Sequence, residues 1–303
     1  MTIIMKKKMG KMGKNMLIAA FPEVGAIGKK VAHALKAEYT KIYVKDFPDS
    51  EFHLKLKRNP KGKTVVIINS ITKDPDEKIV ETVLAEGIAR DYKAKKVILV
   101  ATYLPYMRQD THFMNYDSFS AKHMLEIFAG FDKIIAVDPH LHRIKKMHYL
   151  SHKAESITAD GVVADYIKKN FRREFEIIGP DEESRQWSVR IAHMLKKKVF
   201  ILQKERIGDK KIRQKVAKLG SGKDYIIIDD IISTGHTLVG ALKMAKSQGA
   251  KKLTCIGIHG LLVDNCDKEI RKYANLITTN TIPGRYSKID ISNAIIEKLK
   301  KEK

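Results

Sequence analysis

YIIIDDIISTGHT, residues 225–237, is the stretch that decides the fold of this chain. An apolar run ends in two aspartates, Asp229 and Asp230, and a short turn of small residues follows. Unbroken apolar runs of this kind are typical of strands that are buried on both faces of a parallel sheet. Residues 237–247 then show an amphipathic pattern that predicts a helix. The stretch therefore predicts a strand–turn–helix unit of an open α/β sheet.

The turn in this stretch has the features of a phosphate site. Ligands of open α/β sheets bind beyond the carboxyl ends of the strands. A helix N-terminus there offers unpaired backbone N–H groups and the positive end of its dipole, and Ser233, Thr234 and Thr237 add hydroxyl donors. Asp229 and Asp230 would repel a simple anion, but they suit a ligand with vicinal hydroxyls or a bridging Mg²⁺. A sugar phosphate has these features, and the plainer alternative is a strand end with capping Asp and Ser residues.

Similar apolar runs, rich in valine and isoleucine, alternate with helix-length amphipathic stretches along the chain. The predicted strands are residues 17–20, 65–68, 97–101, 134–137, 175–178, 199–202, 225–228 and 253–258. The predicted helices are residues 78–90, 121–129, 162–170, 183–195, 237–247 and a terminal 287–303. This alternation indicates α/β architecture with mainly parallel sheets flanked by helices.

Two strand–helix–strand blocks of similar length suggest an internal duplication. One block runs from residues 64–69 to the Ala94-Lys95-Lys96 segment, and the other runs from residues 225–228 to Ala250-Lys251-Lys252. We therefore expect two related α/β domains, at residues 16–150 and 151–303.

Two polar, basic segments fall outside this pattern. Residues 1–15 are predicted to be a disordered extension, with Met16 as an alternative start. Residues 204–224 are dense in lysine and arginine and contain three glycines, which predicts a long mobile loop or a weak hairpin. Such a segment could close over a phosphorylated substrate, and the alternative is a solvated surface hairpin.

Composition excludes several classes of protein. The 303 residues are 44% hydrophobic, which excludes disorder as the main state, and no apolar run approaches the length of a membrane span. Two cysteines cannot build a disulfide framework or a four-cysteine zinc site, and the chain is expected to be cytoplasmic. Fifty-eight Lys and Arg against 35 Asp and Glu give a net charge of +23, which favours polyanionic ligands or reflects a solvated basic surface. No nucleic-acid-binding motif accompanies this charge.

The opening stretch resembles the phosphoribosyl-diphosphate loop of the type I phosphoribosyltransferase fold. Five further segments occur in the order typical of the ribose-phosphate diphosphokinase (phosphoribosyl-diphosphate synthetase) family, especially its archaeal-looking members: FPDSE at 47–51, PYMRQD at 105–110, DPH at 138–140, GPD at 179–181 and KER at 204–206. The resemblance covers residues 16–303. It implies two tandem type I phosphoribosyltransferase-like domains. It also implies an enzyme that transfers the β,γ-diphosphoryl group of Mg-ATP to ribose 5-phosphate, giving phosphoribosyl diphosphate and AMP for nucleotide biosynthesis.

The resemblance further implies roles for individual residues. Ribose 5-phosphate is expected to contact Arg206, Asp229, Asp230, Ser233, Thr234, Gly235, His236 and Thr237. ATP is expected to contact Phe47, Asp49, Ser50, Glu51, Arg108 and Gln109. The 47–51 segment would come from a neighbouring subunit of a homo-oligomer, a dimer or larger. His140 and Asp181 match the positions that bind Mg²⁺, and Lys204 and Arg206 match the catalytic positions.

Each assignment has a structural alternative. Phe47 could be a core residue, Arg108 could belong to a surface ion pair, and His140 could be a hydrogen-bonded structural histidine. His142 could be a second ligand, but a solvated side chain is the simpler interpretation. Lys204 and Arg206 could be ordinary loop charges.

The chain departs from the family pattern at two positions. Ser50 and His236 stand where glycine is usual. A positive φ angle at either position would strain a residue that has a Cβ atom.

Two other functions stay open at this point. One is a phosphoribosyltransferase that acts on a base. The other is an inactive regulatory relative or a basic nucleic-acid-binding regulator.

Overall fold

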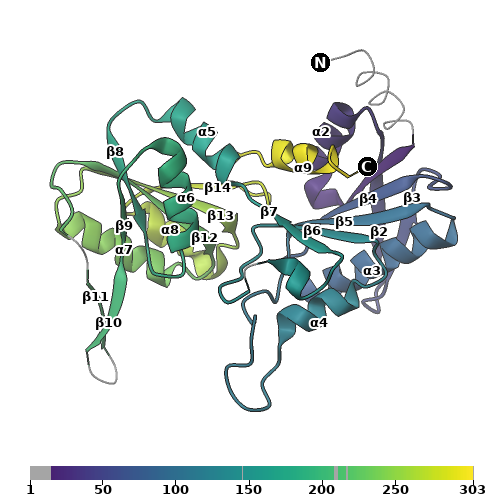
Figure 1. Cartoon of the computed structure of the whole chain (residues 1–303), viewed down its shortest axis with the longest axis horizontal. Helices are drawn as coiled ribbons and strands as arrows, with labels where there is room; N and C mark the ends of the chain where they lie inside the picture. The colour runs from purple at the N-terminus through teal and green to yellow at the C-terminus, as the bar shows by residue number, and fades with distance from the viewer. Residues whose placement is uncertain (1–14, 145, 208–210, 216–217, 303) are drawn as a thin grey trace. The chain divides into compact units, whose positions relative to one another are not determined.

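Strands rich in valine and isoleucine form the centres of two separate sheets (Figure 1). The computed structural model describes residues 15–144, 146–207, 211–215 and 218–302. The predicted N-terminal extension therefore lies outside the described residues, except for Asn15. The chain divides into unit 1, residues 1–158 with 291–303, and unit 2, residues 159–290.

Unit 1 contains a seven-stranded sheet in the order β3-β2-β1-β4-β5-β6-β7. All neighbouring strands are parallel except β2 and β3, which form an antiparallel hairpin. Its elements are β1 (Met16–Ala20), α2 (Gly25–Leu35), β2 (Glu38–Asp46), β3 (Phe52–Leu56), β4 (Thr64–Ser70), α3 (Pro75–Asp91), β5 (Lys96–Tyr103), α4 (Ser120–Ile127), β6 (Lys133–Val137), β7 (Ala154–Ile157) and α9 (Ser292–Leu299). Helices α2 and α9 pack against each other, and α3 packs against β4 and β5.

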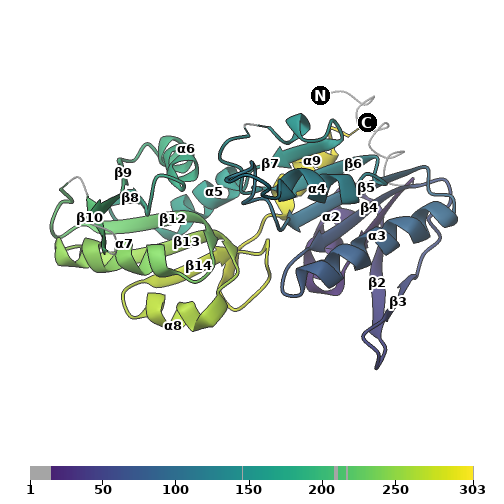
Figure 2. The ribbon, with the colours of Figure 1, turned by 90° about the horizontal axis from the view of Figure 1, so that it is seen from below.

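Unit 2 contains a six-stranded parallel sheet in the order β15-β14-β13-β12-β8-β9. A separate antiparallel pair, β10 with β11, confirms the hairpin alternative for the basic segment. The elements of unit 2 are α5 (Asp160–Asn170), β8 (Phe175–Gly179), α6 (Arg185–Leu195), β9 (Val199–Ile201), β10 (Gln203–Ile207), β11 (Lys211–Lys215), β12 (Asp224–Ile232), α7 (His236–Ser247), β13 (Lys252–Gly260), α8 (Cys266–Arg271), β14 (Asn275–Thr279) and β15 (Ser287–Ile289). Helices α5 and α6 lie on one side of this sheet, and α7 and α8 lie on the other (Figure 2).

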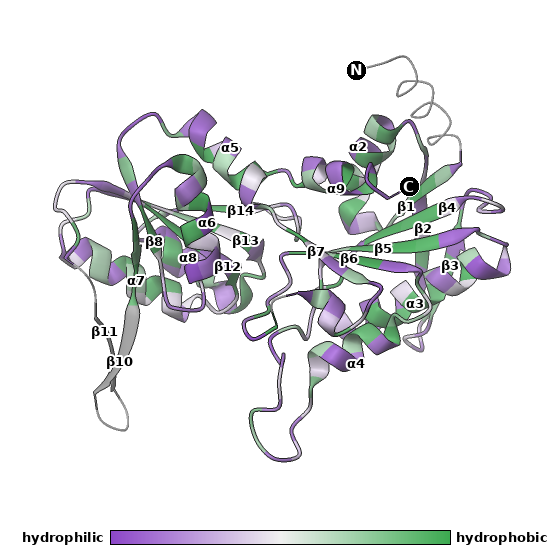
Figure 3. Cartoon of the chain, viewed as in Figure 1, coloured by the Kyte–Doolittle hydropathy of each residue, from purple (hydrophilic) through white to green (hydrophobic). Residues whose placement is uncertain are grey.

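The central strands are buried because helices cover both faces of each sheet. Every residue of β1 is buried, and so is every residue of β4 after Thr64. Figure 3 shows these strands as hydrophobic along their length, whereas the helices carry alternating polar and apolar residues. This is the pattern expected for parallel sheets, and it explains why these strands were predictable.

The two sheets repeat the same topology. The order β2-β1-β4-β5-β6-β7 in unit 1 matches β9-β8-β12-β13-β14-β15 in unit 2, element by element. The predicted duplicated blocks are β4–α3–β5 and β12–α7–β13, which occupy equivalent places. Thr64 pairs with Lys96 at the start of one block, and Asp224 pairs with Lys252 at the start of the other.

The division of the chain differs from the expected boundary at residue 150 in two respects. The boundary between the units in the sequence lies after Thr158, because β7 (Ala154–Ile157) pairs with β6 of unit 1. Residues 291–303 return to unit 1, where Lys298 forms an ion pair with Glu155.

The predicted terminal helix over residues 287–303 is wrong in its first part. Ser287–Ile289 forms β15, which pairs in parallel with β14, and helix α9 begins only at Ser292. Among the described residues, none of the helices combines the length and the apolar composition that a membrane span requires.

Candidate active site

The acid pair lies near the carboxyl end of β12, the edge where open sheets bind ligands. Asp230 is buried, with 3% of its surface exposed, and its backbone N–H donates to Asp229 Oδ1 at 3.1 Å. A turn at Ser233 and Thr234 follows, and α7 begins at His236. The first N–H groups of α7 have no acceptor within the helix, so they are available to bind an anion beyond the strand end.

Gly235 sets the shape of residues 233–237, which we call the phosphate loop because the sequence predicts phosphate binding there. Gly235 is the N-cap of α7 and has a φ of 72°, a left-handed conformation that glycine adopts without strain. His236 is the first residue of the helix, and its φ angle is not positive. The substitution of His236 for the usual glycine therefore causes no backbone strain.

The segment after β13 holds the loop in place through two hydrogen bonds. The carbonyl of Ser233 accepts a hydrogen bond from the backbone N–H of Val263 at 3.2 Å. The same carbonyl accepts from the thiol of Cys266 at 3.0 Å. A Cβ atom on Gly235 would lie 3.0 Å from the Cβ atom of Cys266, so there is little room between the loop and α8. Motif reasoning missed Cys266, because it lies 33 residues from Ser233 in the sequence.

The carboxylates around the strand end repel one another. Burial and the nearby charges of Asp230 and Asp181 raise the pKa of Asp229 well above the usual aspartate value. Asp181 is the second residue after β8, and its carboxylate accepts from the backbone N–H of Ser184 at 3.0 Å. Bound hydroxyl donors or a divalent cation would offset this repulsion, since they favour the charged carboxylates. Asp181 is therefore near enough to the acid pair for its charge to act on Asp229, and its role as a metal ligand stays a prediction.

In unit 1, residues 47–51 form the tip of the β2–β3 hairpin, which extends away from the sheet (Figure 2). The N–H of Ser50 donates to the carbonyl of Phe47, and the N–H of Phe47 donates to the carbonyl of Glu51. Ser50 has a φ of 69°, so the strain considered for this position is present. The ring of Phe47 is 43% exposed, which excludes the alternative that Phe47 is a core residue.

The Arg108-Gln109-Asp110 segment follows β5 in unit 1. Arg108 is exposed and forms no ion pair with any residue that the structure describes, which argues against a surface ion pair as its role. Gln109 is fixed, because its side-chain oxygen accepts from the hydroxyl of Ser120 and its carbonyl accepts from the N–H of Ala121. The exposed guanidinium beside a fixed amide suits contact with an anionic ligand.

His140 and His142 also lie in unit 1, with their Nε2 atoms 2.6 Å apart. Both rings are half-buried and meet edge to face, with ring centroids 4.1 Å apart. His142 is therefore not the solvated side chain that the sequence favoured. Two converging imidazole nitrogens are a donor arrangement that suits a metal ion.

The catalytic positions expected on the basic segment fall on β10. Lys204 pairs with Gln214 across the β10–β11 hairpin, and Arg206 pairs with Ile212. The backbone is described there, but the side chains of Lys204 and Arg206 lie outside the described part of the chain. Their roles therefore stay predictions.

The duplication shows that only one copy carries the acid pair. The positions in β4 that match Asp229 and Asp230 are Asn69 and Ser70. Asn69 is buried and donates to the hydroxyl of Thr82 at 2.8 Å, so it acts as a core residue. Strand β4 of unit 1 therefore occupies the place equivalent to β12 but lacks the two carboxylates.

Comparison with known proteins agrees with this organisation. Residues 16–131 match the model of the N-terminal domain of ribose phosphate pyrophosphokinase, and residues 148–290 match the phosphoribosyl transferase domain. A ribose-phosphate pyrophosphokinase of Thermoplasma acidophilum is 30% identical over 93% of this chain and 98% of its own length. One of Sulfurisphaera tokodaii is 28% identical over 94% of this chain and 100% of its own length.

A solved structure, the phosphoribosylpyrophosphate synthetase of Mycobacterium smegmatis, has the same fold. It covers 95% of this chain and 98% of its own length with a TM-score of 0.83, at 21% sequence identity. Fold and site together define a protein with two tandem phosphoribosyltransferase-type domains, as the sequence predicted. The chain belongs to the ribose-phosphate pyrophosphokinase family. The matches to curated relatives support the diphosphokinase hypothesis and not the two alternatives.

Proposed function

We propose that this chain transfers the β,γ-diphosphoryl group of ATP to the C1 hydroxyl of ribose 5-phosphate, releasing AMP. The observation on which the proposal rests is the end of β12, where the half-buried Asp229 and the buried Asp230 lie next to a glycine-capped helix N-terminus. The phosphate loop suits the 5-phosphate, and the acid pair suits the ribose hydroxyls. The phosphate loop alone would suit any anion, and the acid pair alone would suit a cation. Their combination is what favours a sugar phosphate.

The residues of unit 2 orient the sugar in this proposal. Hydroxyls of Ser233, Thr234 and Thr237, with the N–H groups of the loop, hold the 5-phosphate. Asp229 and Asp230 accept hydrogen bonds from the ribose hydroxyls, which fixes the C1 hydroxyl for attack on the β-phosphorus. Such positioning, together with neutralisation of charge, supplies most of the rate enhancement in phosphoryl transfer.

ATP is proposed to bind to unit 1 residues. Arg108 offers a planar pair of donors for phosphate oxygens, and Gln109 is held beside it. Phe47 offers an exposed ring face for the adenine base, with Asp49, Ser50 and Glu51 in the same turn. This hairpin projects from its own unit, which supports the proposal that it serves the ATP site of a neighbouring subunit in a homo-oligomer (Figure 2).

Mg²⁺ is the proposed cofactor, and His140 in unit 1 and Asp181 in unit 2 are each proposed as a Mg²⁺ ligand on the basis of the family resemblance. When bound, the ion would neutralise charge on the transferred phosphates. The repulsion that raises the pKa of Asp229 is the observation that fits a cation near the acid pair. Lys204 and Arg206 are proposed to neutralise the charge that develops on the phosphates as AMP leaves, and one such donor is worth about 3 kcal/mol.

A direct assay tests the function. The purified chain is incubated with ATP, Mg²⁺ and ribose 5-phosphate, and nucleotides and sugar phosphates are separated by chromatography. We expect AMP and phosphoribosyl diphosphate in equal amounts, and we expect Lys204→Ala to lower the rate about a hundredfold or more while Lys218→Ala leaves it unchanged. Formation of ADP in place of AMP, or no turnover by folded protein, would contradict the proposal.

A further inference from the structure

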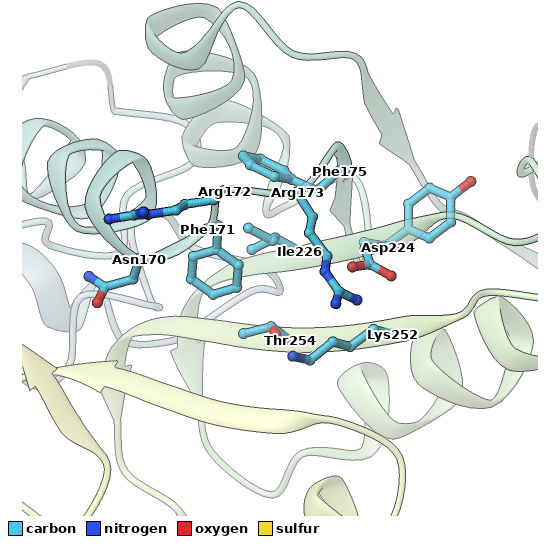
Figure 4. A pocket seen from close by; sticks show the side chains of 10 residues that line it. Asn170, Phe171, Arg172, Arg173, Phe175, Asp224, Ile226, Lys252 and Thr254 are labelled. Atoms are coloured by element: carbon cyan, nitrogen blue, oxygen red, sulfur yellow. The ribbon is translucent and has the colours of Figure 1, made fainter.

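A pocket that is distinct from the candidate active site opens in unit 2, at the amino ends of β8, β12 and β13 (Figure 4). Its volume is about 290 Å³, which is near the lower limit for small-molecule sites, about 300 Å³. Asp224 begins β12 in this pocket, and Asp229 lies five residues further along the same strand. At about 3.3 Å per residue the two positions are roughly 17 Å apart, so the pocket is separate from the phosphate loop.

Three cations line this pocket, Arg172, Arg173 and Lys252, and none is neutralised by the residues that the structure describes. Within the part of the chain that the structure describes, Arg173 and Lys252 have no acidic partner at ion-pair distance. By contrast, the neighbouring Lys223 is paired with Glu176 at 2.7 Å. Figure 4 shows the side chains of Arg173 and Lys252 reaching into the pocket from two different segments. The pocket therefore presents uncompensated positive charge to a ligand.

A hydroxyl group, that of Thr254, also lines the pocket. Thr254 is 2% exposed and lines the pocket beside Ile226, with which it pairs across β12 and β13. Its hydroxyl forms no hydrogen bond with the described residues, and its oxygen is not one of the buried side-chain atoms that lack a partner, so it is accessible from the pocket. A ligand in the pocket could therefore form a hydrogen bond with it.

A carboxylate and an aromatic ring complete the lining. Asp224 is half-buried, and its carboxylate takes part in no ion pair or side-chain hydrogen bond with the described residues. The ring of Phe171 lies beside Arg173 in the pocket (Figure 4) and meets Phe175 edge to face, with centroids 6.1 Å apart. The lining thus combines cations, one acid, one hydroxyl and one flat apolar surface.

We propose that this pocket binds a nucleoside monophosphate. The phosphate would lie between Arg173 and Lys252, because a guanidinium and an ammonium are the preferred partners of phosphate oxygens. Asp224 and the hydroxyl of Thr254 would bond the ribose hydroxyls, and the base would lie against Phe171. A simple anion would leave Asp224 as a repulsive group, whereas a nucleotide gives each of these side chains a partner.

Calorimetric titration of the full chain with AMP tests this proposal. The variant Arg173→Ala/Lys252→Ala is compared with Lys251→Ala, which removes an exposed lysine next to the pocket. Both are also prepared with Arg108→Ala, which disables the ATP site proposed in unit 1. We expect the pocket variant to bind one AMP fewer per chain than the control, or to bind it at least about tenfold more weakly, with or without Arg108.

This design separates failure of the pocket from failure of the proposed function. An error in the assignment of Arg108 would leave two AMP sites in the Arg108→Ala chain, but the pocket variant would still lose one. Inorganic phosphate and adenosine are titrated as probes of the separate parts, and each should bind more weakly than AMP. Equal AMP binding by the pocket variant and the Lys251→Ala control would overturn the proposal, as would phosphate that binds as tightly as AMP. A melting curve for each variant verifies that it is folded.

Discussion

The carboxylate of Asp110, at the end of the Arg108–Asp110 motif, forms hydrogen bonds with the segment around Arg143. Its Oδ2 atom accepts from the backbone N–H groups of His142 at 2.8 Å and Arg143 at 2.7 Å. Its Oδ1 atom accepts from the guanidinium of Arg143 at 3.0 Å. Asp110 is 2% exposed, so one buried carboxylate links the proposed ATP contacts to the segment that carries His140 and His142.

Replacing Asp110 should therefore loosen that segment. We expect Asp110→Asn to lower the free energy of unfolding by about 1–3 kcal/mol, because hydrogen bonds to a charged group are lost and a buried acceptor is changed. Urea unfolding followed by circular dichroism measures the change. Asp91→Asn, an exposed aspartate at the end of α3, should change it by less than about 0.5 kcal/mol. Equal effects of the two substitutions would show that the Asp110 bonds contribute nothing.

The same carboxylate gives a pH dependence of known sign. Burial by itself would raise the pKa of Asp110, but the hydrogen bonds from Arg143 and His142 outweigh it and lower the pKa. A group with a lowered folded-state pKa contributes stability above its unfolded value, about 3.9, and loses it as the pH falls through the folded value. The stability difference between the native chain and Asp110→Asn should be constant from pH 7 to 5 and should shrink below about pH 4. Urea titrations across this range would detect a difference that instead grows on acidification.

Ser50 offers a stabilising substitution. Its φ of 69° costs a residue with a Cβ atom about 1–2 kcal/mol, while glycine adds about 0.5–1 kcal/mol of chain entropy to the unfolded state. Ser50→Gly should therefore raise the free energy of unfolding by about 0.5–1 kcal/mol. Ser50→Ala keeps the strain and should leave stability nearly unchanged. If thermal melting finds Ser50→Gly less stable than Ser50→Ala, the hairpin does not hold this conformation in solution.

The two cysteines should be protected from alkylation in the folded protein. Burial raises the pKa of both thiols, and that of Cys266 reaches about 11. At pH 8 both thiols are therefore almost wholly protonated, and the thiolate is the reactive form. Mass spectrometry after brief iodoacetamide treatment should find neither cysteine labelled in buffer and both labelled in urea. Rapid labelling of Cys266 in buffer would mean that α8 does not cover the phosphate loop as described.

The strands of the sheet centres were predictable because burial on both faces leaves an unmistakable apolar run, as in residues 225–228. Strand β2 was not, since it lies near the sheet edge and its buried positions alternate with exposed ones. The β15 segment was assigned to a helix because three residues carry too little pattern to show a strand. The segment forms a strand because it pairs with β14, and this pairing depends on the folded structure and not on the local sequence.

Some parts of the candidate site could also be predicted from the sequence, whereas others could not. Residues 229–237 form a local motif whose chemistry can be worked out from the sequence, and the structure places them at one strand end. Asp110 with Arg143 and Ser233 with Cys266 are pairs separated by 33 residues each, so only the fold brings them together. The left-handed backbone at Ser50 depends on hairpin geometry that composition does not specify.

The binding of ribose 5-phosphate at the end of β12 is the central claim, and calorimetric titration of ribose 5-phosphate in the presence of Mg²⁺ tests it most directly. We expect saturable binding by the native chain and a dissociation constant at least about tenfold higher for Asp230→Asn, because a charged acceptor of the ribose hydroxyls is lost. Asp91→Asn, at the exposed end of α3, should bind as the native chain does. Unchanged affinity in Asp230→Asn would contradict the account.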